Sequence, residues 1–266
     1  MTRLVVVGGG RMGNALISGL LRAGWVKPED LVIAERMEVA RSEIERRYPD
    51  VRTVAEPVAA DSAVLAVKPA DAEGAARSLA AAGVPRVLSI MAGVTIAQLE
   101  SWLGGGTTVL RAMPNMPAVL GAAASGVAGG PSVSEDDFAW GEAVLSAFGV
   151  VARVPEALLD SVTGLSGSGP AYVFLLAEAM VEAGVAEGID RDVSRLLVTH
   201  TLLGSARLLA ETGESPEALR AAVTSPGGTT AAGLRVLERH AVRSAVVEAV
   251  AAAAERAREL GREPTS

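Results

Sequence analysis

Near its start the chain reads Leu4-Val5-Val6-Val7-Gly8-Gly9-Gly10-Arg11-Met12-Gly13, an apolar run followed by a glycine loop. The run predicts a buried strand, and residues 14–23 have the pattern of a helix. Between them, Gly8 allows a tight turn, Gly10 lets a pyrophosphate approach the backbone, and Gly13 allows close helix packing. The amides of a helix start add positive potential. This context favours a dinucleotide site over a plain glycine turn, with predicted cofactor-binding residues Gly8, Gly9, Gly10, Arg11, Met12 and Gly13.

The N-terminal half continues this alternation of strands and helices. Apolar runs predict buried parallel strands at residues 4–7, 31–34, 63–67, 87–90 and 109–112. Helical patterns at residues 14–23 and 40–47, and capping-box spacing from Thr95 to Gln98, lie between them. We expect residues 121–131 to form a further strand pair, 134–148 a helix, and 150–154 the strand that closes the sheet. The pattern predicts an α/β fold with a Rossmann-type doubly wound sheet.

The pattern changes after Glu156. Helical patterns cover residues 170–183, 192–211, 216–223, 226–238 and 241–260, which predicts an all-helical C-terminal domain. The predicted domains are residues 1–155, which bind the dinucleotide, and residues 156–266, which bind substrate and dimerise. The helix at 192–211 carries an apolar surface wider than one core-facing stripe requires. This favours burial by a partner subunit in a homodimer, and the alternative is a central helix buried within its own domain.

Composition narrows the class of protein. The chain has 266 residues, of which 50% are hydrophobic, and a net charge of −7, which argues against a nucleic-acid-binding surface. Without cysteine there is no disulfide framework, thiol nucleophile or cysteine metal site, and we predict no metal. A strand that begins at Leu4 leaves no room for a signal peptide, and glycine and proline interrupt the uncharged stretches. We therefore expect a cytoplasmic protein that acts on small molecules and has no membrane segment.

Two charged residues at the end of the second strand bear on the choice of dinucleotide. Glu35 comes 22 residues after Gly13, where an acidic side chain can hydrogen-bond the adenosine ribose diol of NAD. Arg36 could instead bind the 2′-phosphate of NADP. A solvated charge pair would look the same in sequence, so the prediction is NADPH or NADH without a choice between them.

Loops after the next strands complete the predicted cofactor site. Ala66, Val67, Lys68 and Pro69, and then Met91, Ala92 and Gly93, lie at or beyond the carboxyl ends of predicted strands. Ligands bind at this edge of open sheets, so we expect both loops to wall the nicotinamide ribose and ring. The stretch at residues 111–117 has turn-forming residues, for which we expect a mainly structural role.

A second stretch of small residues, Ser225-Pro226-Gly227-Gly228-Thr229-Thr230, lies in the helical half. A serine followed by proline suits the N-cap and first turn of a helix, and two glycines let a ligand approach the backbone. Free amides at a helix start attract an anion. The stretch therefore predicts a site for a small carboxylate.

The acids and bases available in the predicted second domain help to distinguish ketone reduction from imine reduction. The predicted second domain has no lysine; His200 and His240 suit packed or solvated positions, and Tyr172 is the one other candidate. Ketone reduction makes an alkoxide that needs a proton, whereas hydride addition to a protonated C=N bond yields an amine directly. Hydroxyls of Thr230 and Ser225 could orient such a nitrogen. This favours an imine reductase over a 3-hydroxyacid dehydrogenase-like oxidoreductase, which would need a lysine there, and over a non-catalytic dinucleotide-binding protein.

Six motifs in order resemble the pyrroline-5-carboxylate reductase family across nearly the whole chain. They are Val7-Gly8-Gly9-Gly10-Arg11-Met12-Gly13, Ala66-Val67-Lys68-Pro69, Ser89-Ile90-Met91-Ala92-Gly93-Val94, Arg111-Ala112-Met113-Pro114-Asn115, Thr163-Gly164-Leu165-Ser166-Gly167-Ser168-Gly169-Pro170-Ala171-Tyr172 and Ser225-Pro226-Gly227-Gly228-Thr229-Thr230. The resemblance implies reduction of 1-pyrroline-5-carboxylate to L-proline, the last step of proline biosynthesis, with hydride from NADPH or NADH. For residues 163–172 we favour a packing role.

The resemblance also implies roles for single residues. Thr230 falls on the threonine that hydrogen-bonds the ring nitrogen, and is the predicted catalytic residue. Ser225, Gly228 and Thr229 fall on the carboxylate-binding loop, and Glu156 falls on a glutamate near substrate and nicotinamide. By the same analogy the helical domains interlock into homodimers, which commonly assemble into decamers.

Overall fold

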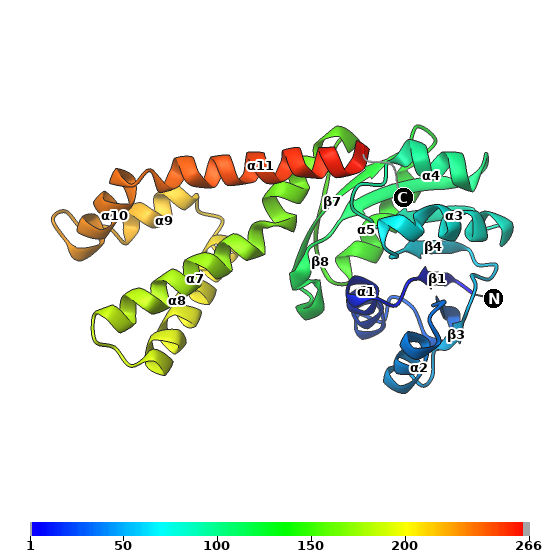
Figure 1. Cartoon of the computed structure of the whole chain (residues 1–266), viewed down its shortest axis with the longest axis horizontal. Coiled ribbons are helices and arrows are strands. Elements are labelled where there is room, and N and C mark those ends of the chain that lie inside the picture. The colour runs from blue at the N-terminus through cyan, green and yellow to red at the C-terminus, as the bar shows by residue number, and fades with distance from the viewer. Residues whose placement is uncertain (1, 263–266) are drawn as a thin grey trace. The chain divides into compact units, whose positions relative to one another are not determined.

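The computed structural model describes residues 2–262, which fall into two compact units. The sheet unit holds the described residues up to Ser168 and those from Val250 onward, and the helical unit spans Gly169–Ala249. Figure 1 shows the strands gathered in the first unit and helices alone in the second. The last helix, α11 (Val242–Arg262), starts in the helical unit and ends in the sheet unit. The boundary expected between residues 155 and 156 stays a prediction.

The sheet unit is built on one sheet of eight strands in the order β3-β2-β1-β4-β5-β6-β7-β8. The strands are β1 (Leu4–Val7), β2 (Leu31–Ala34), β3 (Arg52–Val54), β4 (Ser62–Leu65), β5 (Arg86–Ser89), β6 (Thr108–Met113), β7 (Ala123–Gly129) and β8 (Gly149–Arg153). The strands from β1 to β6 pair in parallel, with Val6 of β1 opposite both Ile33 and Val64. The predicted doubly wound sheet is confirmed, and the strand order reverses at β1.

Two parts of the sheet differ from the prediction. The strand pair expected within residues 121–131 is a single strand, β7, which runs antiparallel to β6 and parallel to β8. Gly121 is in a left-handed turn (φ 74°), and β7 then runs without a turn from Ala123 to Gly129, so no room is left for a second strand. Strand β3 was not predicted, because it has three residues, none of them fully buried.

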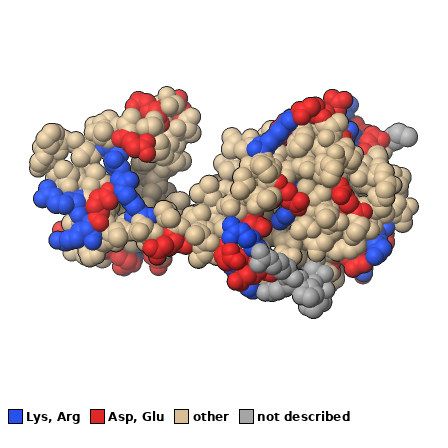
Figure 2. Space-filling view, turned by 90° about the horizontal axis from the view of Figure 1, so that it is seen from above, with Lys and Arg blue, Asp and Glu red and all other residues tan. Residues whose placement is uncertain are grey.

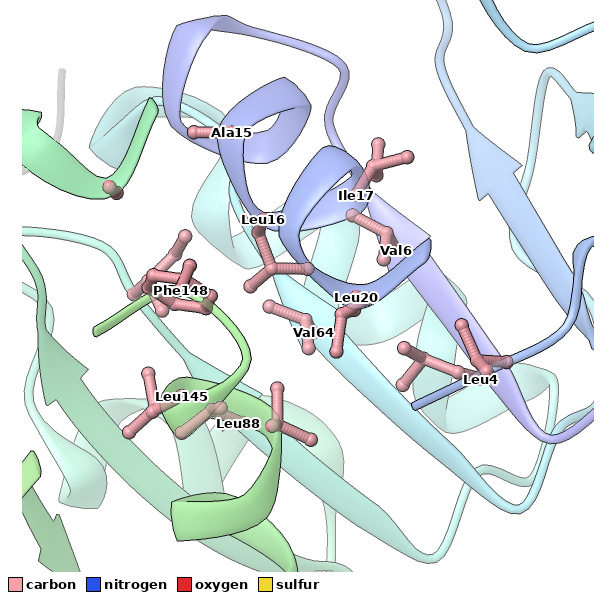
Figure 3. Packing of buried hydrophobic residues seen from close by; sticks show 14 of the residues in the cluster. Leu4, Val6, Ala15, Leu16, Ile17, Leu20, Val64, Leu88, Leu145 and Phe148 are labelled. Atoms are coloured by element: carbon pink, nitrogen blue, oxygen red, sulfur yellow. The ribbon is translucent and has the colours of Figure 1, made fainter. Parts of the chain in front are cut away.

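Helices cover the sheet with two separate apolar cores, because successive strand residues face opposite sides. Leu4 and Val6 face α1 (Arg11–Arg22) and α5 (Glu135–Ser146), whereas Val5 and Val7 face α3 (Ala72–Ala81) and α4 (Ile96–Leu103). Helix α2 (Glu38–Arg47) adds Ile44 to the first core. Figure 3 shows part of the first core, with Leu16 and Leu20 of α1 in the same cluster as Val64 and Phe148. These cores fix α1 and the loops that follow β1, β2 and β4.

In the helical unit, α7 (Gly169–Ala186) and α8 (Arg191–Glu211) pack side by side. Gly184 permits the close approach, because a Cβ there would lie 2.2 Å from Ser194 Oγ. The buried Ser194 hydroxyl donates a hydrogen bond to the Val181 carbonyl at 3.0 Å. Helices α9 (Pro216–Ala222) and α10 (Thr229–Arg239) follow before α11. The all-helical character predicted for this part of the chain agrees with these elements.

Much apolar surface of α7 and α8 is uncovered within one chain. In α8 only Ser194 and Val198 are buried. The apolar side chains that are about half exposed or more are Val173, Phe174, Leu175, Leu176, Val193, Leu196, Leu197, Leu203, Leu208 and Leu209. A central helix buried within its own chain therefore does not explain the apolar surface of α8. Burial by a second subunit is the remaining explanation of the two.

One stretch of the described residues, Glu156–Ala186, is long and apolar enough to pass for a membrane span by length and composition alone. A π-helical turn (Thr163–Gly167) and a bend at Ser168 break its regular α-helix, and its start belongs to a different unit from its end. The expected absence of a membrane segment stays a prediction.

Acidic and basic side chains lie interspersed on the face of the molecule shown in Figure 2. Many form exposed ion pairs, such as Arg77 with Glu73 and Arg153 with Glu135 in the sheet unit, both at 2.7 Å. Such exposed pairs contribute little to stability. The sheet unit therefore rests on its two apolar cores rather than on its surface charges.

Candidate active site

In the glycine loop after β1, close backbone contacts exclude a side chain at two positions, Gly8 and Gly13. Gly8 has a φ of 101°, and a Cβ there would lie 2.6 Å from the carbonyl oxygen of Ala66. At Gly13 a Cβ would lie 2.1 Å from the carbonyl oxygen of Gly8. Because the opposing atoms are backbone, neither clash is relieved by a side-chain rotation. The first turn of α1 is thereby held close against the end of β1.

The start of α1 is open to an anion. Gly10 is the N-cap residue and provides no side-chain cap, and the first intrahelical bond runs from Asn14 N to Gly10 O at 2.8 Å. The amides of Arg11, Met12 and Gly13 therefore lack helical acceptors. A Cβ added at Gly10 would meet nothing within 4 Å. Space and positive potential coincide here, which fits the pyrophosphate of a dinucleotide.

Gly9, in contrast, is held by side chains. Its amide donates to Glu35 Oε2 at 2.8 Å, and its carbonyl accepts from the side-chain amide of Asn14. Glu35 Oε1 in turn accepts from the amide of Met37 at 2.9 Å. The acidic residue at the end of β2 and the glycine loop after β1 thus form one hydrogen-bonded unit. Asn14 was not predicted as a site residue, and its type and spacing alone carry no signal of this contact.

A cleft of about 930 Å³ lies over these loops. Of the residues predicted to bind cofactor, it is lined by Gly8, Gly9, Gly10, Glu35, Arg36, Ala66, Val67 and Lys68. It is not lined by Arg11, Met12, Gly13, Pro69, Met91, Ala92 and Gly93, which lie outside its wall. Lining residues that the sequence did not single out include Met37, Ala40, Glu56, Pro57, Asp71 and Ser78. They come from the loops after β2, β3 and β4, from α2 and from α3, and none of them lies within a motif that the sequence analysis singled out.

The loop after β5 is packed rather than open. Met91 is 3% exposed, and its amide donates to Ser89 Oγ at 3.3 Å. Gly93 has a φ of 74°, and a Cβ there would lie 3.6 Å from the backbone of Gly261 near the end of α11. The exposed member of the predicted triplet is Ala92. Met91 therefore packs into the core beneath the sheet edge as part of the second apolar cluster. A role of this loop in lining the nicotinamide stays a prediction.

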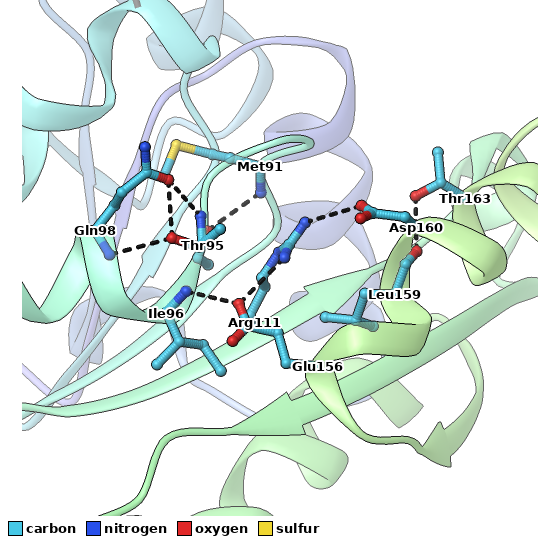
Figure 4. Close-up of polar contacts among 10 residues, drawn as sticks. Met91, Thr95, Ile96, Gln98, Arg111, Glu156, Leu159, Asp160 and Thr163 are labelled. Atoms are coloured by element: carbon cyan, nitrogen blue, oxygen red, sulfur yellow. Dashed lines mark hydrogen bonds and ion pairs between the residues drawn. The ribbon is translucent and has the colours of Figure 1, made fainter. Parts of the chain in front are cut away.

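Arg111 of β6 lies at the centre of a polar cluster with two carboxylates (Figure 4). Its guanidinium is almost fully buried and lies 3.2 Å from Glu156 Oε1 and 3.6 Å from Asp160 Oδ1. Glu156 Oε1 also accepts from the amide of Ile96, the first residue of α4, at 2.7 Å. Removing Arg111 would leave two partly buried carboxylates without their cation, whereas removing either carboxylate would still leave Arg111 one partner. Glu156 is thus anchored at the carboxyl edge of the sheet.

Asn115 makes a second link from the loop after β6 to the segment that follows Asp160. Its side-chain amide donates to the Ser166 carbonyl at 2.9 Å, and its Oδ1 accepts from the amide of Ala124 at 2.9 Å. Ser166 lies in a π-helical turn (Thr163–Gly167) that continues α6 (Leu159–Val162). Gly164 packs there against α11, since a Cβ would lie 2.6 Å from the Val250 carbonyl oxygen. The structural roles expected for residues 111–117 and 163–172 agree with these contacts.

The small-residue stretch of the helical unit differs from its prediction in one respect. Ser225 and Pro226 are not the N-cap and first residue of a helix, because α10 begins at Thr229 with Gly228 as its N-cap. Ser225 and Pro226 instead form a turn closed by a hydrogen bond from Gly228 N to Ser225 O at 3.1 Å. Gly227 has a φ of 72°, which proline before glycine in a turn favours. The turn delays the helix by three residues.

The open donors of α10 lie just after this turn. Gly228 provides no side-chain cap, and the first helical bond runs from Ala232 N to Gly228 O at 3.1 Å. The amides of Thr229, Thr230 and Ala231 therefore lack helical acceptors. Ser225 Oγ packs against Gly228, where a Cβ would lie 2.3 Å from it. The stretch places two threonine side chains and three amides at the positive end of a helix dipole.

The remaining candidates in the helical unit are two histidines and a tyrosine. His200 and His240 are both exposed. The hydroxyl of Tyr172 lies 3.5 Å from the carbonyl oxygen of Ala249. Among residues 2–262 no group of histidines, aspartates and glutamates is arranged to hold a metal ion.

The whole chain is similar to curated reductases. It is 43% identical to the pyrroline-5-carboxylate reductase of Mycobacterium tuberculosis over 287 aligned positions, which cover 98% of this chain and 97% of that relative. The chain belongs to the pyrroline-5-carboxylate reductase family. The reductase of Synechocystis is 40% identical, with 98% of each chain covered. The resemblance based on six motifs is confirmed.

Solved reductase structures and two family models agree. The reductase of Coxiella burnetii matches with a TM-score of 0.92 and 34% identity, over 98% of this chain and 99% of that one. That of Plasmodium falciparum, solved with NADP bound, matches with a TM-score of 0.84 and 28% identity over 98% of each chain. Residues 156–260 match a model described as pyrroline-5-carboxylate reductase dimerisation. Residues 3–93 match one described as NADP oxidoreductase, coenzyme F420-dependent.

Proposed function

We propose that this reductase converts 1-pyrroline-5-carboxylate to L-proline with NADPH or NADH, the last step of proline biosynthesis. Full-length similarity to curated pyrroline-5-carboxylate reductases carries the proposal. The structure adds a cleft at the start of α1 whose shape and donors fit a dinucleotide. When bound, the dinucleotide supplies the hydride.

Within the dinucleotide site, the chain's own groups would bind and orient. The amides of Arg11, Met12 and Gly13 would hold the pyrophosphate, and Gly10 leaves the space for it. Glu35 or Arg36 would face the adenosine ribose. Ala66 to Pro69 and Met91 to Gly93 would lie toward the nicotinamide half, at the carboxyl edge of the sheet.

The substrate would bind at the start of α10. We assign its carboxylate to the turn and first amides formed by Ser225, Gly228 and Thr229, where backbone donors and the helix dipole favour an anion. We assign the ring nitrogen to the hydroxyl of Thr230. Glu156, held by Arg111 and the Ile96 amide, would stand as a fixed negative charge near the iminium.

Reduction of the iminium requires the protein to orient the substrate for hydride but not to supply a proton donor. Hydride addition to a protonated C=N bond removes a positive charge and leaves a neutral amine, so no alkoxide has to be protonated. The helical unit contains no lysine to serve as such a donor, which a 3-hydroxyacid dehydrogenase of this architecture would need. The open start of α10 argues against a non-catalytic dinucleotide-binding protein.

Assembly into a homodimer through the helical unit would bury the exposed apolar side chains of α7 and α8. The match of residues 156–260 to a dimerisation model supports this assignment. A decamer of such dimers and a cytoplasmic location complete the proposal. Sedimentation of the purified chain tests the assembly, because a monomer at micromolar concentration would contradict it.

Turnover tests the activity directly. Purified protein with 1-pyrroline-5-carboxylate should oxidise NADH or NADPH, and proline should accumulate in equal amount. Folded protein that binds a dinucleotide but consumes neither with this substrate would overturn the assignment. In that case a non-catalytic role would gain support.

A further inference from the structure

The carboxylate of Glu35 is fixed on the wall of the dinucleotide cleft. One oxygen accepts from the Gly9 amide at 2.8 Å and the other from the Met37 amide at 2.9 Å. The Glu35 amide itself donates to the Val54 carbonyl at 2.9 Å, which continues the pairing of β2 with β3. Two backbone amides thus hold the carboxylate, and the bond to Val54 fixes the backbone that carries it. A ligand in the cleft therefore meets a carboxylate that does not swing away freely.

The neighbouring cations do not pair with the Glu35 carboxylate. Arg36 is 71% exposed in its side chain and lies 3.9 Å from Glu56 Oε1. Arg41 donates to the backbone carbonyl of Glu35 at 2.9 Å rather than to its carboxylate. Glu56 also accepts from Ser78 Oγ at 3.2 Å, so it too is held on this wall. Among the described residues, no cation forms an ion pair with the Glu35 carboxylate.

This arrangement has opposite effects on the two dinucleotides. With the pyrophosphate at the start of α1, the adenosine ribose lies near the end of β2. The 2′- and 3′-hydroxyls of NADH can donate to the free lone pairs of the Glu35 carboxylate. The 2′-phosphate of NADPH carries a charge of about −1.5 to −2, which would lie against that carboxylate in a partly enclosed cleft. Arg36 also lines the cleft but lies beside Glu56, whose negative charge partly offsets its own.

We propose that Glu35 makes this reductase select NADH over NADPH. The inference rests on the proposed function only in that the chain binds a reduced nicotinamide dinucleotide. The fold does not decide the choice, because the reductase of Plasmodium falciparum shares it and was solved with NADP bound. The side chain at position 35 and its two amide partners decide it here.

Binding without substrate tests the proposal. Fluorescence titration of the full-length protein with each reduced dinucleotide should give a Kd for NADH at least about tenfold below that for NADPH. The variant Glu35→Gln, which keeps an acceptor for an amide but removes the charge, should shrink this ratio by about tenfold or more. Glu38→Gln removes the same charge three residues away, on the exposed first turn of α2, and should leave the ratio within about twofold of its original value.

The outcomes separate this proposal from the proposed activity. Equal or tighter binding of NADPH by the unaltered protein would overturn it, even if the protein turns over 1-pyrroline-5-carboxylate. An equal change of the ratio in Glu35→Gln and Glu38→Gln would also overturn it, since general charge would then be the cause. A tenfold preference for NADH without any imine reduction would sustain it and defeat the proposed activity. If Glu35→Gln fails to fold, the variant Glu35→Ser takes its place, and the ratio of the two Kd values should again be about tenfold or more smaller than in the unaltered protein.

Discussion

Helices α1 and α5 pack on the same face of the sheet, yet their first turns are completed in opposite ways. At α5, Ser134 Oγ accepts from the Asp137 amide, and Asp137 Oδ2 accepts from the Ser134 amide at 3.0 Å. At α1, Gly10 brings no side chain, and no side chain of the described residues caps its first amides. At the start of α5, backbone donors are used in capping hydrogen bonds that stabilise the helix. The open start keeps them for a ligand.

The same contrast separates α4 from α10. Thr95 and Gln98 cap α4 reciprocally, as the sequence predicted, and Glu156 takes the amide of Ile96 as well. Gly228 caps α10 with backbone alone. A capping box thus marks helix starts that support the fold, and a glycine cap marks the two starts to which we assign anions.

The two open starts differ from each other in what holds them. Gly8 and Gly13 fix the start of α1 through contacts with buried backbone. The start of α10 is shaped by a turn of exposed residues around Gly227. Substitutions at the first should therefore affect folding and binding together, whereas those at the second should affect catalysis more than stability.

The largest effect is expected at Gly13. A Cβ in Gly13→Ala would lie 2.1 Å from the Gly8 carbonyl oxygen, so the loop must shift. We expect the free energy of unfolding to fall by about 1–3 kcal/mol, and NADH binding to weaken by at least about tenfold. Urea denaturation and fluorescence titration measure the two. In Gly10→Ala the added methyl meets no protein atom within 4 Å, so stability should hold while binding weakens. Unchanged stability in Gly13→Ala would contradict the view that backbone packing holds the start of α1.

The next effect tests the open start of α10. Thr230→Ala should lower kcat by about tenfold or more, because the ring nitrogen loses the group that orients it for hydride. The Kd for NADH should stay the same, since the hydroxyl is assigned to substrate. Steady-state kinetics and dinucleotide titration separate the two quantities. Thr230→Ser restores a hydroxyl and should recover most of kcat; equal kinetics for the alanine variant would remove the residue from the site.

A smaller effect is expected at the closed start of α5. Burial works to raise the pKa of Asp137, but hydrogen bonds from Ser134 and the nearby Arg86 guanidinium, 2.7 Å away, outweigh it and hold the pKa below its ordinary value of 3.8. A lowered pKa adds stability above pH 3.8 that fades as pH falls through the folded-state value. Asp137→Asn should therefore cost about 1–2 kcal/mol at pH 7 and progressively less below about pH 4.

Urea denaturation from pH 7 to pH 3 follows this difference. Asp136→Asn alters an exposed neighbour in the same turn and should cost less than about 0.5 kcal/mol at every pH. If the loss of stability in Asp137→Asn grew toward acid pH, the pKa of Asp137 would be raised rather than lowered in the folded protein.

The smallest effect concerns the turn before α10. Gly227→Ala places a side chain at a φ of 72°, which should cost about 1 kcal/mol and raise KM for 1-pyrroline-5-carboxylate as the turn relaxes. Gly83→Ala meets the same strain at a φ of 71° in the loop before β5, away from both sites. The two variants should lose similar stability, but only Gly227→Ala should change KM. A matching change of KM in both would show that strain alone is the cause.

Local patterns were sufficient for most elements because their physical causes are local. The buried strands β1 and β2 were predicted to the residue from apolar runs, and the cap of α4 from the spacing of Thr95 and Gln98. The same patterns failed at β3 and within residues 121–131, where the strand depends on pairing with a neighbour rather than on its own apolar residues.

The sequence by itself determined the sheet, the helical second part, the glycine loop and the family, because each depends on residue types at short spacing. Only the tertiary structure decided that the Glu35 carboxylate binds the Gly9 amide, that Arg36 turns to Glu56, and that Arg111 joins Glu156 and Asp160. These contacts join residues 20 to 49 positions apart. Such distances along the chain close only when the strands pair and the helices pack, so no local pattern records them.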